Sequence, residues 1–251
     1  MNKNKVIAKV NPLVLKGIAH RGLHNDEYTE NGLKAFQNAI EHNLAFELDV
    51  HLTTDDRLIV CHDSSLLRTT GKEGIIEDLS VKEIKDNYRL LDGEEVPTFQ
   101  EVLNLTEERV PIVVELKVFR KNYKPLAKRV IEELSQIKDK KNIIIISFDP
   151  RALVCMKKAG FIRQLLVTTD KEYAWIYHLR FLFESVDLDY RFLDQEKVRK
   201  YSKKHFVNIW TIETAEVMEK YFPFCDTMTF QHLDEKEVVG KLSEKNKNHL
   251  S

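Results

Sequence analysis

The sequence predicts an α/β protein folded as a (β/α)8 TIM barrel, with a small subdomain inserted after the second strand. Short apolar runs alternate with longer amphipathic segments along the 251 residues, and no Pro-, Gly- or Ser-rich linker divides them. Strands that alternate with helices imply βαβ units and a parallel sheet. Eight such units match the size and the repeat number of this barrel. We therefore expect one domain over residues 1–251.

The predicted strands are short apolar runs bounded by polar or turn-forming residues. In chain order they are Gly17–His20, Ala45–Val50, Ile112–Lys117, Ile143–Phe148, Gln164–Thr168, Val186–Tyr190, Phe206–Thr211 and Thr227–Phe230. The predicted helices are the longer segments that follow them, in which apolar residues recur at helical spacing. They are Asn31–Glu41, Phe99–Asn104, Lys124–Ile137, Pro150–Lys158, Tyr173–Phe183, Gln195–Lys204, Ala215–Tyr221 and Glu235–Ser243.

A long segment between the second and third barrel strands interrupts this alternation. Leu58–Cys61 is predicted to form an extra short strand, and Ser64–Val96 a long insertion. Inside the insertion, Ser80 and Glu83 have the spacing of a capping box, which predicts the start of a helix. An excursion of this length within a compact fold is usually functional. At the end of the chain, the Lys-, Asn- and Glu-rich residues 243–251 predict a loose tail.

Composition and charge exclude several classes of function. The chain carries 39 Lys and Arg against 40 Asp and Glu, so it lacks the global positive field that attracts nucleic acid or anionic membranes. Three scattered cysteines support neither a disulfide framework nor a Cys-based zinc site. The amino terminus has no apolar run of signal-peptide length, and the longest apolar run, Ile143–Ile146, cannot span a membrane. We expect a cytoplasmic protein without a nucleic-acid partner or stable membrane insertion.

Candidate metal ligands lie on the second and third barrel strands. Side chains alternate along a strand, so Glu47 and Asp49 share one face, which in a barrel points inward. An isolated pair of this kind is more often just the polar face of a strand near the rim. On the third strand, however, Glu115 and Lys117 also share a face, which adds a third carboxylate at a similar depth. Three carboxylates suit one hard divalent cation, Mg²⁺ or Ca²⁺, rather than zinc.

Two histidines and two cationic side chains complete this candidate site. His20 ends the first strand and His62 follows the extra strand, so both face the same rim. Each histidine alone is more often a buried core or capping residue. Beside a metal they offer an acid and a base near neutral pH. Arg21 offers a planar fork for phosphate, and Lys117 is either a phosphate ligand or an ion-pair partner of Glu115. Together these residues predict a phosphoryl-transfer site.

Five motifs, in this order along the chain, resemble the glycerophosphodiester phosphodiesterase family. They are His20-Arg21, Glu30-Asn31, Glu47-x-Asp49, His62-Asp63 and Glu115-x-Lys117. Further matches are Ile145-Ile-Ser-Phe148 and Asn208-Ile-Trp-Thr211, so the resemblance extends from about Gly17 to Trp210. It implies a phosphatidylinositol-phospholipase-like TIM barrel with a family-typical insertion after the second strand, where residues 64–96 lie here.

The resemblance also implies a role for each motif. One cation, Mg²⁺ or Ca²⁺, would bind to Glu47, Asp49 and Glu115. The general acid/base pair would be His20 and His62, and the phosphate would be held by Arg21 and Lys117. The implied reaction is hydrolysis of a small-molecule glycerophosphodiester to glycerol 3-phosphate and an alcohol, and attack by a neighbouring glycerol hydroxyl through a cyclic phosphate is one route. Which histidine acts first stays open.

Four further motif residues are expected to support the site, namely Glu30, Asn31, Asp63 and Trp210. For Glu30, at the start of the first helix, two readings are about equally favoured. It is either a secondary metal or support ligand, or an ordinary acidic residue in a first helical turn.

The chain departs from the family pattern at Gly32, at Glu213 and in residues 224–232. The family usually has Ser or Thr at the first position and Asn at the second. In the last segment Asp226 is kept, but the Thr-Asp-x-Pro signature is not. Because of these departures, the sequence does not determine which alcohol is the leaving group. Alternative functions are a related barrel enzyme acting on lysophospholipids or polymer-derived diesters, with a cyclising reaction as one option, and a catalytically idle phosphodiester-binding protein.

Residues Tyr173–Phe183 are unusually aromatic. Such a segment could form a lip that contacts lipid or a bulky alcohol. We favour the commoner explanation, a barrel helix with a broad buried face or a contact in a homodimer, because aromatic side chains mostly supply buried area.

Overall fold

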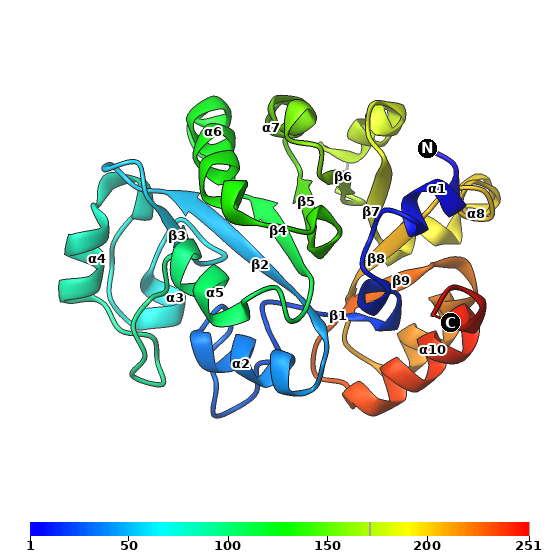
Figure 1. Ribbon diagram of the computed structural model, residues 1–251, viewed down its shortest axis with the longest axis horizontal. Helices are drawn as coiled ribbons and strands as arrows, with labels where there is room; N and C mark the ends of the chain where they lie inside the picture. Colours follow the sequence, from blue (N-terminus) through cyan, green and yellow to red (C-terminus); the bar gives the residue numbers. More distant parts are fainter. Residues whose placement is uncertain (171, 251) are drawn as a thin grey trace.

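The computed structural model describes residues 1–170 and 172–250, with the side chains of residues 248–250 left out. Within these residues one sheet has the strand order β1-β9-β8-β7-β6-β5-β4-β2-β3. An additional pairing of β1 with β2 closes eight parallel strands into a barrel (Figure 1). The ninth strand, β3, pairs antiparallel with β2 outside this ring. The predicted (β/α)8 barrel is therefore confirmed.

The observed strands agree with the predicted ones to within a few residues. They are β1 Ile18–Ala19, β2 Ala45–Leu52, β3 Leu58–Val60, β4 Ile112–Leu116, β5 Ile143–Ser147, β6 Ile162–Val167, β7 Ser185–Asp189, β8 Val207–Ile212 and β9 Thr227–Phe230. The α-helices are α1 Lys3–Ile7, α2 Leu33–Glu41, α3 Leu67–Thr70, α4 Val81–Asn87, α5 Phe99–Thr106, α6 Tyr123–Glu133, α7 Pro150–Cys155, α8 Glu196–Ser202, α9 Ala215–Tyr221 and α10 Glu235–Leu250.

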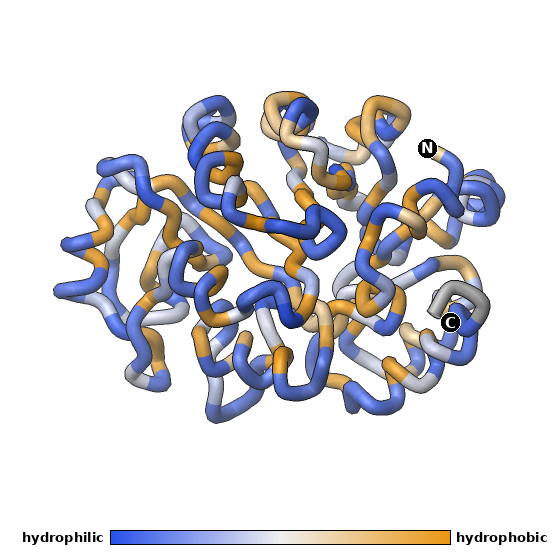
Figure 2. Tube along the Cα trace, in the orientation of Figure 1, coloured by the Kyte–Doolittle hydropathy of each residue, from blue (hydrophilic) through white to orange (hydrophobic). Residues whose placement is uncertain are grey.

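Side chains of β2 show how the barrel is packed. Phe46, Leu48 and Val50 point outward, where they join the apolar cluster between the strands and the surrounding helices. Ala45 points inward and packs with other interior side chains. Figure 2 shows hydrophobic residues along the strands and hydrophilic residues on the outer turns of the helices. The inward positions of Glu47 and Asp49 follow from the same alternation.

The amino-terminal residues have a role that the sequence pattern did not indicate. Helix α1 and the 3₁₀ helix η1 (Pro12–Lys16) place Val6, Val14 and Leu15, all fully buried, against interior residues at the amino ends of the strands. Thr227 Oγ1 also donates a hydrogen bond of 2.5 Å to the Val14 carbonyl. This segment therefore closes the bottom of the barrel, opposite the carboxyl ends of the strands.

The chain between β3 and α5 forms a small subdomain beside the barrel, at the left in Figure 1. It contains α3, the 3₁₀ helix η2 (Ile76–Asp78) and α4, which surround an apolar cluster of its own. Helix α4 begins at Ser80, whose side chain accepts a hydrogen bond from the Glu83 N–H while the Glu83 carboxylate accepts one from the Ser80 N–H. The predicted capping box is confirmed.

Two expectations about local structure were wrong. Residues after Ser243 are not a loose tail, because α10 continues to Leu250. The buried amide of Asn246 holds it there by donating to the carbonyl oxygens of Leu15 and Asp226, 3.0 and 2.9 Å away. Ser251, the last residue of the predicted tail, lies outside the described residues.

The aromatic segment also differs from the favoured prediction. It forms a 3₁₀ helix, η6 (Ala174–Leu182), rather than an α-helix with a broad buried face. Ile176 and Tyr177 are buried, but the side chains of Trp175 and Phe181 are 58% and 70% exposed. Aromatic side chains lose rotamer freedom in an α-helix, so a run of them gives little support for α-helical geometry.

None of the described helices combines the length and the apolar character needed to cross a membrane. Cytoplasmic location and a homodimer stay predictions.

Candidate active site

The three predicted metal ligands lie together at the carboxyl ends of β2 and β4. These strands pair in parallel with Asp49 opposite Glu115, and Glu47 lies two residues earlier on β2. One carboxylate oxygen from each of the three lies within 4.8 Å of the others, and all three side chains are buried. Strand pairing and alternation thus bring Glu115 to two carboxylates that lie more than sixty residues earlier in the chain.

The two predicted phosphate ligands lie beside these carboxylates. Lys117 Nζ is 2.9 Å from Glu115 Oε1 and 3.4 Å from Asp49 Oδ1. Arg21 Nε is 3.6 Å from Asp49 Oδ2, and the Arg21 backbone N–H donates to Glu47 Oε2 at 3.0 Å. Arg21 has a φ of 54°, in the left-handed region that non-glycine residues rarely adopt. This conformation directs both its N–H and its side chain toward the carboxylates.

The surroundings shift the pKa values of the three carboxyl groups in different directions. Burial, with the charge of Asp49 adding to it, raises the pKa of Glu47 well above its usual value, and burial raises the pKa of Glu115 to about 7. Burial also opposes ionisation of Asp49, but Lys117, His62 and Arg21 hold its pKa below the usual range. Asp49 is therefore the carboxylate that stays ionised most readily, while Glu47 and Glu115 need further positive charge.

A divalent cation fits this donor set. Asp49 Oδ1 is buried and receives no hydrogen bond from the described residues, although Lys117 Nζ is 3.4 Å away. A buried oxygen of this kind is usually satisfied by a partner such as a metal ion or water. Three carboxylates without Cys or His among them are the oxygen ligands that Mg²⁺ and Ca²⁺ prefer.

His20 lies just after β1, at the same end of the barrel. Its Nδ1 is 2.6 Å from Gln231 Oε1, and its Nε2 is 3.9 Å from Glu47 Oε2. Burial and the neighbouring Arg21 charge lower the pKa of His20 to about 4. The ring therefore presents one nitrogen to the carboxylates and is neutral when no ligand is bound.

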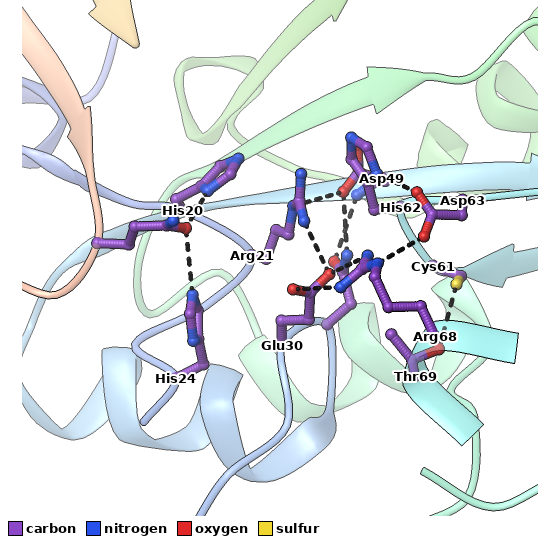
Figure 3. Close-up of polar contacts among 12 residues, drawn as sticks. His20, Arg21, His24, Glu30, Asp49, Cys61, His62, Asp63, Arg68 and Thr69 are labelled. Atoms are coloured by element: carbon purple, nitrogen blue, oxygen red, sulfur yellow. Dashed lines mark hydrogen bonds and ion pairs between the residues drawn. The ribbon is translucent and has the colours of Figure 1, made fainter. Parts of the chain in front are cut away.

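His62 lies at the opposite side of the site and belongs to a chain of ion pairs (Figure 3). Its Nδ1 is 2.6 Å from Asp63 Oδ1, and Asp63 Oδ2 accepts a hydrogen bond of 2.7 Å from Arg68 Nε. Arg68 also donates to Glu30, which in turn accepts from Arg21 at 2.8 Å. Burial lowers the pKa of His62, and the Asp63 carboxylate opposes that effect. The chain connects the two histidine-bearing loops across the site.

The support residues occupy three different places. Glu30 lies outside the cluster of three carboxylates and pairs with Arg21 and Arg68. Asn31, with a φ of 57°, donates from Nδ2 to Asp49 Oδ2 at 3.0 Å. Trp210 lines the pocket, and its Nε1–H donates to the Asp187 carbonyl at 3.2 Å.

A pocket of about 80 Å³ lies among these groups. Glu47, Glu115 and both histidines line it, and so do Asp187, Trp210 and Thr229. Asp187 was missed in the sequence analysis. Burial raises its pKa to about 7, and its Oδ1 accepts a hydrogen bond of 2.8 Å from Asn208. Its alternation with Leu188 on β7 was the signal that could have found it.

A second, open groove of about 680 Å³ begins at the same place. It shares His62, Glu115 and Phe148 with the smaller pocket. From there it extends past Lys117 to the exposed aromatic residues Tyr173 and Trp175 of the η6 region. The aromatic segment therefore forms one wall of a groove that leads out of the site.

His51 is a second residue whose place in the site was missed. It is buried on β2, with Nδ1 2.6 Å from Glu77 Oε1 in η2 and Nε2 3.2 Å from the His62 carbonyl. These contacts join the inserted subdomain to the barrel and hold the backbone at His62. Five of the nine histidines, His51 among them, lie between positions 20 and 62, but spacing alone could not supply its partner.

Comparisons with known proteins show which family the chain belongs to. Residues 20–224 match the model of the Glycerophosphoryl diester phosphodiesterase family. A glycerophosphodiester phosphodiesterase of Caldanaerobacter subterraneus is 32% identical over 215 residues, which cover 81% of this chain and 88% of that protein.

Solved structures show the same fold. A glycerophosphodiester phosphodiesterase from Thermotoga maritima has a TM-score of 0.70 and 27% identity, with 90% of this chain and 96% of that one covered. An Oleispira antarctica phosphodiesterase, solved in complex with the product sn-glycerol-3-phosphate, has a TM-score of 0.73 and 21% identity, with coverage of 93% and 95%. The protein described here belongs to the glycerophosphoryl diester phosphodiesterase family and is an enzyme of that class.

Proposed function

We propose that the enzyme hydrolyses glycerophosphodiesters to glycerol 3-phosphate and an alcohol, with one bound Mg²⁺ or Ca²⁺ and with His20 and His62 as the general acid/base pair. The observation that carries this proposal is the cluster of three buried carboxylates at a pocket that His20, His62 and Arg21 also line. The glycerol 3-phosphate complex of the Oleispira antarctica enzyme, which has the same fold, supports this product.

Each group has a defined task in this proposal. Glu47, Asp49 and Glu115 would hold the cation, which when bound polarises a phosphoryl oxygen and neutralises developing charge. Arg21 and Lys117 orient the phosphate, since both are cations within 4 Å of these carboxylates. His20 and His62 hold and transfer protons on either side of the phosphate.

The two cavities would take the two halves of the diester. The smaller pocket offers the side chains of Asp187 and Thr229 as hydrogen-bond partners for the glycerol hydroxyls. The open groove, with Phe148 and Trp175 on its walls, would take the alcohol. Because this groove is long and aromatic, a lysophospholipid with an acyl chain is the second candidate substrate.

The test is a panel of diesters assayed with enzyme stripped by EDTA and then supplied with single divalent metals. Glycerophosphocholine and lysophosphatidylcholines of increasing chain length would be compared, and ³¹P NMR would separate glycerol 3-phosphate from a cyclic phosphate. We expect no turnover in EDTA and recovery with Mg²⁺ or Ca²⁺. His20→Ala and His62→Ala should each lower kcat by at least about 100-fold.

Matched variants separate the parts of the proposal. Glu115→Gln should raise the metal concentration needed for activity, whereas Glu196→Gln, at an exposed carboxylate on α8, should leave it unchanged. Trp175→Ala should lower kcat/KM for long-chain lysophosphatidylcholine but not for glycerophosphocholine if the groove binds an acyl chain. Full activity in excess EDTA would contradict the metal role.

A further inference from the structure

Two positions at which the sequence departs from the family pattern contact each other beside His20. Gln231 follows β9, and its Nε2 donates to Glu213 Oε1, which follows β8, at 2.5 Å. The other end of the Gln231 amide, Oε1, is 2.6 Å from His20 Nδ1. The residues come from the ends of three neighbouring strands, β8, β9 and β1. The two departures from the family pattern, Glu213 and Gln231, are thus joined by a hydrogen bond.

The chemistry of these groups fixes the direction of each hydrogen bond. A carboxylate only accepts, so the side-chain amide of Gln231 must present its nitrogen to Glu213 and its oxygen to His20. An amide oxygen also only accepts, so His20 Nδ1 must carry a proton. In the neutral ring the lone pair then lies on Nε2, the nitrogen that is 3.9 Å from Glu47 Oε2.

His24 adds a second donor to the same oxygen. Its Nε2 is 3.4 Å from Gln231 Oε1. An amide oxygen has two lone pairs and can accept from both rings. Among the described residues, the Gln231 oxygen is the only hydrogen-bond partner of His20 Nδ1. The orientation of the Gln231 amide therefore decides which nitrogen of His20 carries the proton.

We propose that Gln231 is a positioning residue that fixes the tautomer of His20, and that Glu213 acts through it by fixing the orientation of the amide. The proposal rests on the proposed function, in which His20 accepts or donates the proton in turnover. His62 is held differently, by the Asp63 carboxylate. The two histidines of the pair thus have unlike partners, a neutral amide and an anion.

Kinetics of variants test this role in the Mg²⁺-loaded enzyme, with glycerophosphocholine as substrate. Gln231→Leu keeps the approximate size of the side chain but removes the acceptor, so kcat should fall by about tenfold or more while KM changes little. Gln37→Leu is the matched control. Gln37 also donates to a glutamate, Glu41 Oε1, at 2.7 Å on α2, but it has no histidine partner among the described side chains. Its kcat should equal that of the wild type.

A paired substitution distinguishes positioning from a structural role. In Glu213→Gln the residue at position 213 can donate or accept, so the Gln231 amide is free to flip and kcat should fall by about threefold or more. Adding Gln231→Glu restores a group at position 231 that can only accept, with an amide beside it to donate. The double variant should therefore regain activity relative to Glu213→Gln. Lack of recovery would overturn the role of Glu213.

NMR of the histidine rings gives a readout that does not depend on turnover. Long-range ¹H–¹⁵N spectra of the ¹⁵N-His-labelled protein should show His20 as the Nδ1–H tautomer in the wild type and as a mixture in Gln231→Leu. An Nε2–H tautomer in the wild type would refute the proposal, and so would wild-type kcat in Gln231→Leu. If the wild type hydrolyses no diester, the proposed function fails, while the tautomer assignment is still decided by the spectra.

Discussion

Asp187 and Asp189 lie two residues apart on β7, but their surroundings move their pKa values in opposite directions. Burial raises the pKa of Asp187 to about 7. Asp189 is also buried, which opposes ionisation, but the side chain and backbone N–H of Arg191 lower its pKa. In the unfolded wild-type chain Asp187 ionises near pH 4, whereas in the folded protein it stays protonated up to about pH 7. Its contribution to stability is therefore lost as pH rises between these values.

Asp187→Asn should remove this pH-dependent loss of stability, because an amide does not ionise. Its oxygen can still accept the hydrogen bond from Asn208. We expect the metal-free variant to be more stable than the wild type by about 2–4 kcal/mol at pH 8 and equally stable near pH 4. Urea unfolding at both pH values measures this difference. Asp189→Asn is the control with the opposite sign. It should destabilise the protein at neutral pH, and that effect should disappear as pH falls below the lowered pKa of Asp189.

At the level of elements, the inserted subdomain is coupled to the site through η2. The buried pair of His51 and Glu77 joins this helix to β2, and His51 also contacts the His62 carbonyl. Glu77→Ala would leave His51 buried without its partner, at a cost of about 1–3 kcal/mol. We expect faster hydrogen exchange in residues 61–98 and a lower kcat, with the barrel strands still protected.

The neighbouring residue provides the control for this prediction. Asp78 also links η2 to the barrel, through an ion pair of 2.8 Å with Arg120, but both side chains are more than half exposed. An exposed pair contributes about 0–1 kcal/mol, so Asp78→Ala should change neither exchange nor kcat appreciably. Equal effects of the two substitutions would show that the buried pair has no special role.

At the level of the whole molecule, the amino-terminal segment completes the barrel core from below. Leu15 is fully buried among interior side chains. Leu15→Ala should lower the free energy of unfolding by about 2–5 kcal/mol. Leu91, on the inserted subdomain and 70% exposed, is the control, and Leu91→Ala should change stability by less than about 0.5 kcal/mol. Denaturant unfolding monitored by circular dichroism measures both, and equal losses would contradict the closing role of the segment.

Much of the candidate site was predictable because it depends on local periodicity. Alternation along β2 and β4 was enough to put Glu47, Asp49 and Glu115 on inward faces, and parallel pairing then sets them at one depth. The partners of these residues were not predictable. Arg68, Glu77 and Gln231 contact site residues over separations of 38, 26 and 211 positions. No sequence period links residues so far apart, because only the fold decides which loops meet.

The sequence by itself determined the barrel, the inward-facing acidic cluster and the motifs of the site, since each follows from strand periodicity and from residue chemistry read along the chain. Only the tertiary structure decided that the amino terminus closes the barrel, that α10 continues past Ser243, and that the aromatic segment is half exposed beside a groove. The physical reason is that burial and hydrogen-bond partners are properties of three-dimensional neighbours. For the same reason, only the fold shows that Glu213 and Gln231, two separate departures in the sequence, contact each other, and that Gln231 contacts His20.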